Sequence, residues 1–232
     1  MKKGMIIAID GPAGVGKSTV CKLLAKHLGY TYLDTGAMYR AMAWAAIAEN
    51  LNLDDESEIA RRLALLPLRF TIENGALSIF YKEKKLDDEL RQPEISVRAS
   101  HISQLKCVRD YLTRCQRQLG ERGGIVAEGR DMTTVVFPDA PVRIYLAADL
   151  KARTGRRFLE YRNKGIAADL ASLEAQIKAR DEADEQRALA PLRAAPGVCV
   201  VDTSHMNISE VVTQLMTLIP LETAEKDASI RG

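Results

Sequence analysis

One short segment has the residue types and spacing of a phosphate-binding loop. The run Gly11-Pro12-Ala13-Gly14-Val15-Gly16-Lys17-Ser18 fits the pattern G-x-x-x-x-G-K-[ST] at every fixed position. Glycines allow successive backbone N–H groups to converge on one phosphate, a lysine reaches the β and γ oxygens, and the last hydroxyl can ligate Mg²⁺. The segment therefore predicts a nucleoside triphosphate site with Ser18 as a metal ligand.

The loop alone does not distinguish a kinase from a GTPase switch or a motor ATPase. We find no N/T-K-x-D motif, which a GTPase should carry.

Arginines are the second group with a chemical use. Negative charge spreads over the equatorial oxygens during phosphoryl transfer, and nearby cations stabilise it. Arg153 and Arg157 are four residues apart and so share a helix face, with Arg156 adjacent. This helix is either a solvated basic face or a lid that closes over the triphosphate and excludes water. The other candidate cations are Arg40, Arg109, Arg130, Arg180 and Arg187.

Two acidic segments follow predicted strands. Glu128-Gly129-Arg130-Asp131 follows one strand, and Asp34-Thr35-Gly36 follows another. Ligand sites in open α/β sheets lie at the carboxyl ends of the strands. Glu128 either holds the water shell of Mg²⁺ or caps the turn. Asp34 acts near the acceptor phosphate or Mg²⁺, or only N-caps the next helix. The residues themselves leave both questions open.

The elements that must position these residues alternate between strand and helix. Short apolar runs predict strands, and apolar residues at helical spacing predict helices. The predicted strands are Met5–Ile9, Tyr30–Leu33, Ile125–Ala127, Val142–Leu146 and Val198–Val201. The predicted helices are Lys17–Leu28, Ala37–Glu49, Leu53–Leu66, Glu94–Leu119 with a break, Leu150–Lys164, Leu170–Asp184 and Asn207–Leu218. The fold class is α/β, with a P-loop NTPase-type parallel sheet covered by helices on both faces.

One region departs from this alternation. Leu68–Ile72 and Ala76–Tyr81 are β-like runs separated by Glu73-Asn74-Gly75. Asn-Gly between such runs is the strongest short-range hairpin signal. Leu68 to about Leu90 is therefore predicted to be a small antiparallel β insertion.

Composition excludes several classes. The 232 residues carry a net charge of +2, which gives no support for a nucleic-acid binder. The longest apolar stretch, Ala41–Ala48, is far too short to cross a membrane, and no targeting segment is visible, so we expect a cytoplasmic protein. The four cysteines form no CxxC pair and are expected to be reduced and mostly buried.

Five segments together resemble bacterial cytidylate kinases, in the same order and over nearly the whole chain, from about Met5 to Leu218. They are DGPAGVGKST (Asp10–Thr19), LDTGAMYR (Leu33–Arg40), AEGRDMTTVVFPDAPV (Ala127–Val142), IKARDEADEQRALAPL (Ile177–Leu192) and VDTS (Val201–Ser204). The resemblance implies transfer of the γ-phosphoryl group from ATP, with Mg²⁺, to CMP or dCMP. The partners it implies are small-molecule nucleotides. We also expect a monomer, with neither nucleic acid nor membrane as a partner. A kinase for another nucleoside monophosphate or small metabolite, and a non-catalytic P-loop switch, are the alternatives.

The resemblance also implies a division of the chain. Residues 1–66 and 97–220 would form the core kinase domain, with a helical lid at about 152–184. Residues 67–96 would be the β insertion of the acceptor domain. Residues 221–232 are expected to be a disordered tail because the segment is polar.

Individual roles follow from the same resemblance. Gly11, Pro12, Ala13, Gly14, Val15, Gly16, Lys17, Ser18 and Thr19 would bind ATP. Thr35, Arg40, Ser100, Arg109, Arg130, Asp131, Arg180, Asp184 and Arg187 would bind the acceptor, with Ser100, Arg109 and Asp131 reading the cytosine ring. The catalytic set would be Lys17, Arg130, Arg153, Arg157, Arg180 and Arg187. The chain departs from the family at Thr35, where serine is common, and at Glu128, where aspartate is common.

Overall fold

Within residues 4–220, the chain forms one sheet of eight strands. The computed structural model describes residues 4–220, so the tail expected at 221–232 lies outside the described residues. The strand order is β3-β4-β2-β6-β1-β7-β8, with β5 paired to β4. The strands are β1 Ile6–Asp10, β2 Thr31–Asp34, β3 Leu68–Glu73, β4 Ala76–Tyr81, β5 Lys84–Leu86, β6 Ile125–Gly129, β7 Val142–Ala147 and β8 Cys199–Asp202.

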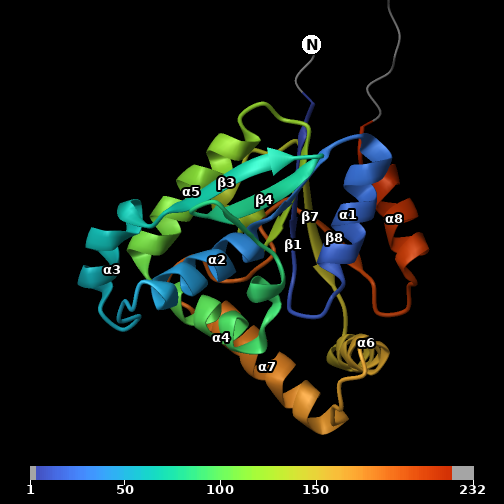
Figure 1. The fold of residues 1–232 in the computed structure, drawn as a ribbon. Coiled ribbons are helices and arrows are strands. Elements are labelled where there is room, and N and C mark those ends of the chain that lie inside the picture. The colour runs from blue at the N-terminus through green and yellow to red at the C-terminus, as the bar shows by residue number, and fades with distance from the viewer. Residues whose placement is uncertain (1–3, 221–232) are drawn as a thin grey trace, which may run out of the picture.

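The centre of the sheet is parallel. β1 pairs in parallel with β6 and β7, β2 with β6, and β7 with β8. The carboxyl ends of these strands therefore meet at one edge, where an open α/β sheet binds its ligands. Helices α6 and α7 lie beyond this edge (Figure 1). This arrangement confirms the predicted parallel sheet.

Helices cover both faces, and each face has its own core. Successive β1 residues point to opposite sides: Ile7 and Ile9 pack with α1 and α8, and Ala8 packs with α2 and α5. The helices are α1 Lys17–Leu28, α2 Thr35–Ala48, α3 Glu56–Arg62, α4 Pro93–Ile102, α5 Lys106–Gly120, α6 Leu150–Asn163, α7 Leu170–Gln186 and α8 Ile208–Thr217. Short 3₁₀ turns occupy Leu63–Leu65 and Asp88–Arg91.

Most predicted helices are confirmed to within a few residues, but two differences have clear causes. The helix predicted over Leu53–Leu66 is α-helical only from Glu56 to Arg62, because the Asp55 carboxylate accepts the Glu58 N–H and fixes the start. The five residues Met132–Val136 form a π-helical turn, η3, which the sequence analysis did not predict.

The antiparallel insertion is confirmed, with its turn at the predicted residues. Asn74 and Gly75 have φ values of 51° and 72°, as a two-residue hairpin loop requires, and Glu73 pairs with Ala76 across it. Strand β4 also pairs in parallel with β2 at Tyr32 and Ala76. The hairpin therefore extends the main sheet beyond β2 (Figure 1).

The four cysteines are free thiols, as expected. The expectation that most are buried was wrong: only Cys21 is buried, Cys107 and Cys115 are half-buried, and Cys199 is exposed on the edge strand β8. Within residues 4–220, no helix is long and apolar enough to cross a membrane.

Candidate active site

The phosphate loop joins the end of β1 to the start of α1. Gly14 and Gly16 adopt positive φ values of 74° and 95°, which L-residues rarely adopt. Gly16 is the N-cap of α1 and provides no side chain to bind the first N–H groups of the helix. A Cβ atom on Gly16 would meet nothing within 4 Å. The helix start is therefore an open cradle of backbone donors, which suits a phosphate.

Lys17 is folded over this loop. Its Nζ donates hydrogen bonds to the carbonyl oxygens of Gly11, at 2.6 Å, and Pro12, at 2.8 Å. Burial first, and then the charge of the nearby Arg130 guanidinium, lower the pKa of Lys17 to about 7. An anion placed in the cradle would oppose both effects and favour the charged ammonium.

Glu128 lies at the end of β6, beside Ser18 and Lys17. Burial raises the pKa of this carboxyl, as does Asp34, while Lys17 and the hydroxyls of Tyr32 and Ser18 lower it. The Tyr32 hydroxyl donates a hydrogen bond to Glu128 Oε1. Ser18 and Glu128 thus bring two oxygen ligands together. No cluster of three or more His, Cys, Asp or Glu side chains that could hold a metal occurs in residues 4–220, so the rest of a Mg²⁺ shell would come from phosphate and water.

Asp34 has two partners that settle its local role. Its Oδ1 accepts the Ala37 N–H at 2.9 Å and so N-caps α2, and its Oδ2 accepts from Arg40 at 3.1 Å. Thr35 is buried, and its hydroxyl donates to the Glu128 carbonyl oxygen at 2.6 Å. The start of α2 therefore presents Arg40 at the same sheet edge as the phosphate loop.

A buried ion pair joins α5 to the turn that follows β6. Arg109 on α5 donates through NH2 to Asp131 Oδ2, and both side chains are at most 6% exposed. Arg109 also donates to the Ser103 carbonyl oxygen at 3.0 Å, and its guanidinium lies 5.6 Å from the centre of the Tyr39 ring. Ser100 makes no hydrogen bond to either member of this pair in the described part of the chain.

A second charged group adjoins this pair. Asp184 on α7 accepts from Arg130 at 2.9 Å and lies 3.8 Å from Arg187. The side chain of Arg187 is 5% exposed; its Nε donates to the Ala190 carbonyl oxygen, and its NH2 atom has no partner among residues 4–220. Desolvation and then the Arg130 charge lower the pKa of Arg180 to about 10, even though its side chain reaches solvent. Arg130 and Arg180 repel each other, and Arg187 has a buried N–H group without an acceptor. An anion bound among them would relieve the repulsion and accept this hydrogen bond, so the cluster suits an anion.

Comparison with known proteins identifies the family. The model of the family described as cytidylate kinase matches residues 7–221. A cytidylate kinase of Syntrophotalea carbinolica is 42% identical over 232 residues, covering 100% of this chain and 99% of that protein. Cytidylate kinases of Geobacter sulfurreducens and Bacillus cereus are 41% and 37% identical, covering 94% of this chain and 94% and 97% of theirs. The chain belongs to the cytidylate kinase family.

Family membership confirms the resemblance drawn from the sequence, and the structure adds where each predicted residue lies. The phosphate loop, Glu128, Arg130 and Arg180 gather at the carboxyl edge of the sheet, with the Arg109–Asp131 pair beside them. Ser100, near the end of α4, makes no hydrogen bond to this group within the described residues.

The predicted lid arginines differ from one another. Arg153 is buried and donates to the carbonyl oxygen of Ala13 at 3.0 Å and to Asp181. Asp181 in turn accepts the Ala13 N–H at 3.0 Å. Helices α6 and α7 are therefore both hydrogen-bonded to the phosphate loop. Arg157 pairs with Glu160 at 3.1 Å, and its charge is among those that lower the pKa of Arg180.

Sequence reasoning missed several residues of the site. Asp10, Tyr32, Tyr39 and Asp181 all contact predicted site residues or the segments that carry them. Asp10 gave the one available signal, because it is a carboxylate at the end of an apolar strand directly before the loop. Tyr32, Tyr39 and Asp181 reach their partners only in the folded chain, so no neighbouring residue in the sequence marks them.

Proposed function

We propose that this chain catalyses the ATP-dependent phosphorylation of CMP and dCMP to the diphosphates, by in-line transfer of the γ-phosphoryl group. Membership of the cytidylate kinase family supports a nucleotide kinase. The buried Arg109–Asp131 pair is the observation that carries the choice of acceptor. A pyrimidine ring offers hydrogen bonds along one edge, and a fixed donor beside a fixed acceptor can read that edge.

The pair suits cytosine better than uracil. Asp131 engages Arg109 through Oδ2, and no described residue donates to its Oδ1, so Oδ1 is available to the exocyclic N4–H₂ of cytosine. Arg109 can only donate, and so suits N3 or O2. Uracil would set O4 against the carboxylate and N3–H against the guanidinium. Each mismatch leaves a buried polar group unpaired, at a cost of about 1–3 kcal/mol.

The phosphates would occupy the cationic edge. The ATP phosphates would bind the backbone donors of Gly11 to Thr19, with Lys17 released from the loop carbonyls onto the β and γ oxygens. The acceptor phosphate would bind among Arg40, Arg130 and the free NH2 of Arg187, with Thr35 beside it. Arg180 and Asp184 would contact the ribose and phosphates, and Ser100 the base.

No side chain needs to act as a strong base, because the acceptor phosphate is already an anion. Catalysis is then positioning together with stabilisation of the charge that develops on the transferred group. Lys17, Arg130, Arg180 and Arg187 would stabilise that charge, as would the lid arginines Arg153 and Arg157. Arg153 also joins α6 to α7 and to the phosphate loop, which would help to exclude water.

Mg²⁺ fits the donors that the chain provides. Ser18 would ligate the ion directly, and Glu128 would hold one of its waters; both offer oxygen, which this cation prefers. When bound, Mg²⁺ neutralises charge on the phosphates and orients them for transfer.

The remaining expectations complete the proposal. Residues 67–96 would act as the acceptor domain and 152–184 as the lid, each closing on its nucleotide. The enzyme would work as a cytoplasmic monomer whose partners are ATP, CMP and dCMP, with neither nucleic acid nor membrane as a ligand.

A panel of acceptors tests the proposal. ADP release is coupled to an optical signal and measured with CMP, dCMP, UMP, AMP and GMP, and without acceptor. We expect turnover with CMP and dCMP that exceeds turnover with the other three acceptors by at least about two orders of magnitude in kcat/KM. Turnover with only another acceptor would assign a different kinase, and ATP hydrolysis indifferent to every acceptor would favour a P-loop switch.

A further inference from the structure

The turn that carries Asp131 is held at both ends by two charged side chains, Asp10 and Arg117, to which the proposed mechanism gives no role. This turn consists of Asp131 and the π-helical residues Met132–Val136. Its wide hydrogen bonds run from Val136 N–H to the Asp131 carbonyl, at 3.1 Å, and from Phe137 N–H to Met132, at 2.8 Å. Such turns are rare and occur often at functional sites. The first N–H groups and the last carbonyls of the turn need partners from elsewhere in the molecule.

Asp10 supplies the partner at the start of the turn. Its Oδ1 accepts the Met132 N–H at 2.8 Å, and its Oδ2 accepts both the N–H and the hydroxyl of Thr133 at 2.7 Å. Asp10 is fully buried and ends β1, one residue before the phosphate loop. Its carboxylate therefore ties the turn to the strand that carries the donor site.

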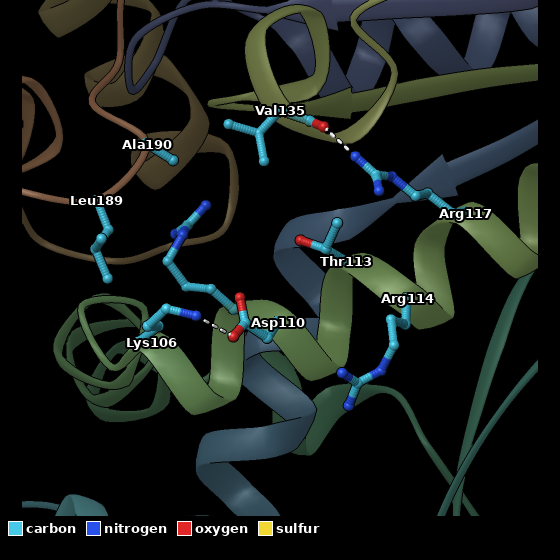
Figure 2. A pocket seen from close by; sticks show the side chains of 9 residues that line it. Lys106, Asp110, Thr113, Arg114, Arg117, Val135, Leu189 and Ala190 are labelled. Carbon is cyan, nitrogen blue, oxygen red and sulfur yellow. Dashed lines mark hydrogen bonds and ion pairs between the residues drawn. The ribbon is translucent and has the colours of Figure 1, made fainter.

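Arg117 supplies the partner at the end of the turn. From α5, its NH2 donates to the Val135 carbonyl oxygen at 2.7 Å and its Nε to the Val136 carbonyl oxygen at 2.9 Å. Figure 2 shows the Arg117 side chain reaching up from the helix to Val135. The same helix carries Arg109, two turns earlier, which pairs with Asp131. Helix α5 thus holds both the base-reading pair and the far end of the turn.

These contacts fix the distance and the angle between Asp131 and Arg109. Asp131 has φ −149° and ψ 22°, and it lies between a predicted phosphate contact, Arg130, and the first residue held by Asp10. Moving Met132 by a few tenths of an ångström would move the Asp131 carboxylate with it, because the two are adjacent in the chain. A carboxylate reads N4–H₂ only if it stays in the plane of the base.

We infer that Asp10 and Arg117 are positioning residues for acceptor recognition: by clamping the two ends of the 131–136 turn, they hold the Asp131 carboxylate where it discriminates cytosine from uracil. The inference rests on the proposed CMP kinase function and deepens it. It also links the two halves of the site, because Asp10 adjoins the donor loop while the turn it holds belongs to the acceptor side.

The first variant is Asp10→Asn, assayed with CMP and UMP side by side. Asparagine keeps the size of the side chain and one oxygen, but sets an NH₂ group against one of the two backbone N–H donors. We expect kcat/KM for CMP to fall by about tenfold to a hundredfold and the CMP/UMP ratio of kcat/KM to fall by at least about tenfold, since a hydrogen bond to a charged group is lost at the start of the turn. The KM for ATP should change by less than about threefold.

The second variant is Arg117→Ala, with Arg114→Ala as its matched control. Arg114 lies one turn earlier on the same helix, and its side chain makes no ion pair or hydrogen bond in the described part of the chain (Figure 2). Arg117→Ala should lower the CMP/UMP ratio by about threefold to tenfold. Arg117→Lys, which can still donate, should restore part of it, and Arg114→Ala should leave it unchanged.

The CMP/UMP ratio of kcat/KM distinguishes a positioning role of Asp10 and Arg117 from a contribution to the stability of the fold. Loss of folded enzyme lowers turnover with both acceptors by one factor and leaves the CMP/UMP ratio at its wild-type value. Folded Asp10→Asn and Arg117→Ala proteins that keep the wild-type ratio would overturn the inference. If Asp10→Asn does not fold, Arg117→Ala decides alone. Wild-type enzyme in the same assay tests the proposed function separately, because absence of CMP turnover there removes that function whatever the variants do.

Discussion

The proposed donor and acceptor halves of the site are built in different ways. The donor half is one continuous segment, Gly11–Ser18, whose ligands are mainly backbone N–H groups at the start of α1. The acceptor half is assembled from side chains on α2, α5, α7 and the turn after β6, and it contains the ion pairs Arg109–Asp131 and Arg130–Asp184. Backbone donors bind any triphosphate, whereas a set of directed, buried side chains can reject a ring with the wrong hydrogen-bond pattern. Substitutions in the two halves should therefore have different signatures.

The largest effect is expected in the donor half. Lys17→Ala should lower kcat by about two to three orders of magnitude with either acceptor, because the lost charge matters most in the transition state. The CMP/UMP ratio should stay the same. Lys26→Ala, in the exposed last turn of the same helix, is the control. Near-normal kcat in a folded Lys17→Ala protein would contradict the assignment of the loop.

Glu128 tests whether the donor half holds a cation. Glu128→Gln can still accept the Tyr32 hydroxyl but loses the charge, so the Mg²⁺ concentration for half-maximal rate should rise about tenfold to a hundredfold, as for other outer-shell ligands. The measurement is a Mg²⁺ titration of initial rates. The exposed Glu121→Gln is the control. An unchanged titration would leave Glu128 with a purely structural role.

Asp181 tests the grip of the lid on the loop. Asp181→Ala removes the acceptor of the Ala13 N–H and the partner of Arg153, so kcat/KM for ATP should fall by about tenfold while the KM for CMP changes little. Glu182→Ala, its exposed neighbour on α7, is the control. If Asp181→Ala changed the kinetic parameters for ATP and CMP equally, or changed them no more than Glu182→Ala does, the contact would not be specific to the donor side.

The smallest expected effect is the uptake of a proton by Lys17 when the nucleotide binds. The pKa of Lys17 is about 7 in the free protein, and a bound triphosphate raises it, so at pH 8 binding should take up about nine-tenths of a proton. Nucleotide affinity should accordingly fall as pH rises above 7. Calorimetry of ATP binding in buffers of different ionisation enthalpy measures the uptake. Lys17→Ala should abolish it, and equal uptake in that variant would move the effect to another group.

The same contrast explains what the sequence could predict. The donor loop and α1 are encoded by neighbouring residues, so both were predicted with their bounds. The hairpin at Asn74-Gly75 was predicted for the same reason, because two adjacent residues select the turn. The acceptor residues were predicted only through the family resemblance, since nothing local marks Arg109 and Asp131 as partners.

Contacts between distant parts of the chain escaped prediction. Asp10 meets Thr133 across 123 positions, and Asp181 meets Ala13 across 168. The turn at Met132–Val136 is rich in threonine and valine, which favour strands, and it becomes a π-helix because Asp10 and Arg117 satisfy its two ends. Contacts made by such distant residues cannot be predicted from local secondary-structure propensity.

The most direct test of the account is Asp131→Ala, with kcat/KM for CMP and UMP measured in parallel. If the Arg109–Asp131 pair reads the base, turnover of CMP should fall heavily and the CMP/UMP ratio should collapse toward unity, while the KM for ATP stays within about threefold of wild type. An Asp131→Ala enzyme that folds and keeps the wild-type CMP/UMP ratio would contradict the account, because the buried pair would then have no part in choosing the acceptor.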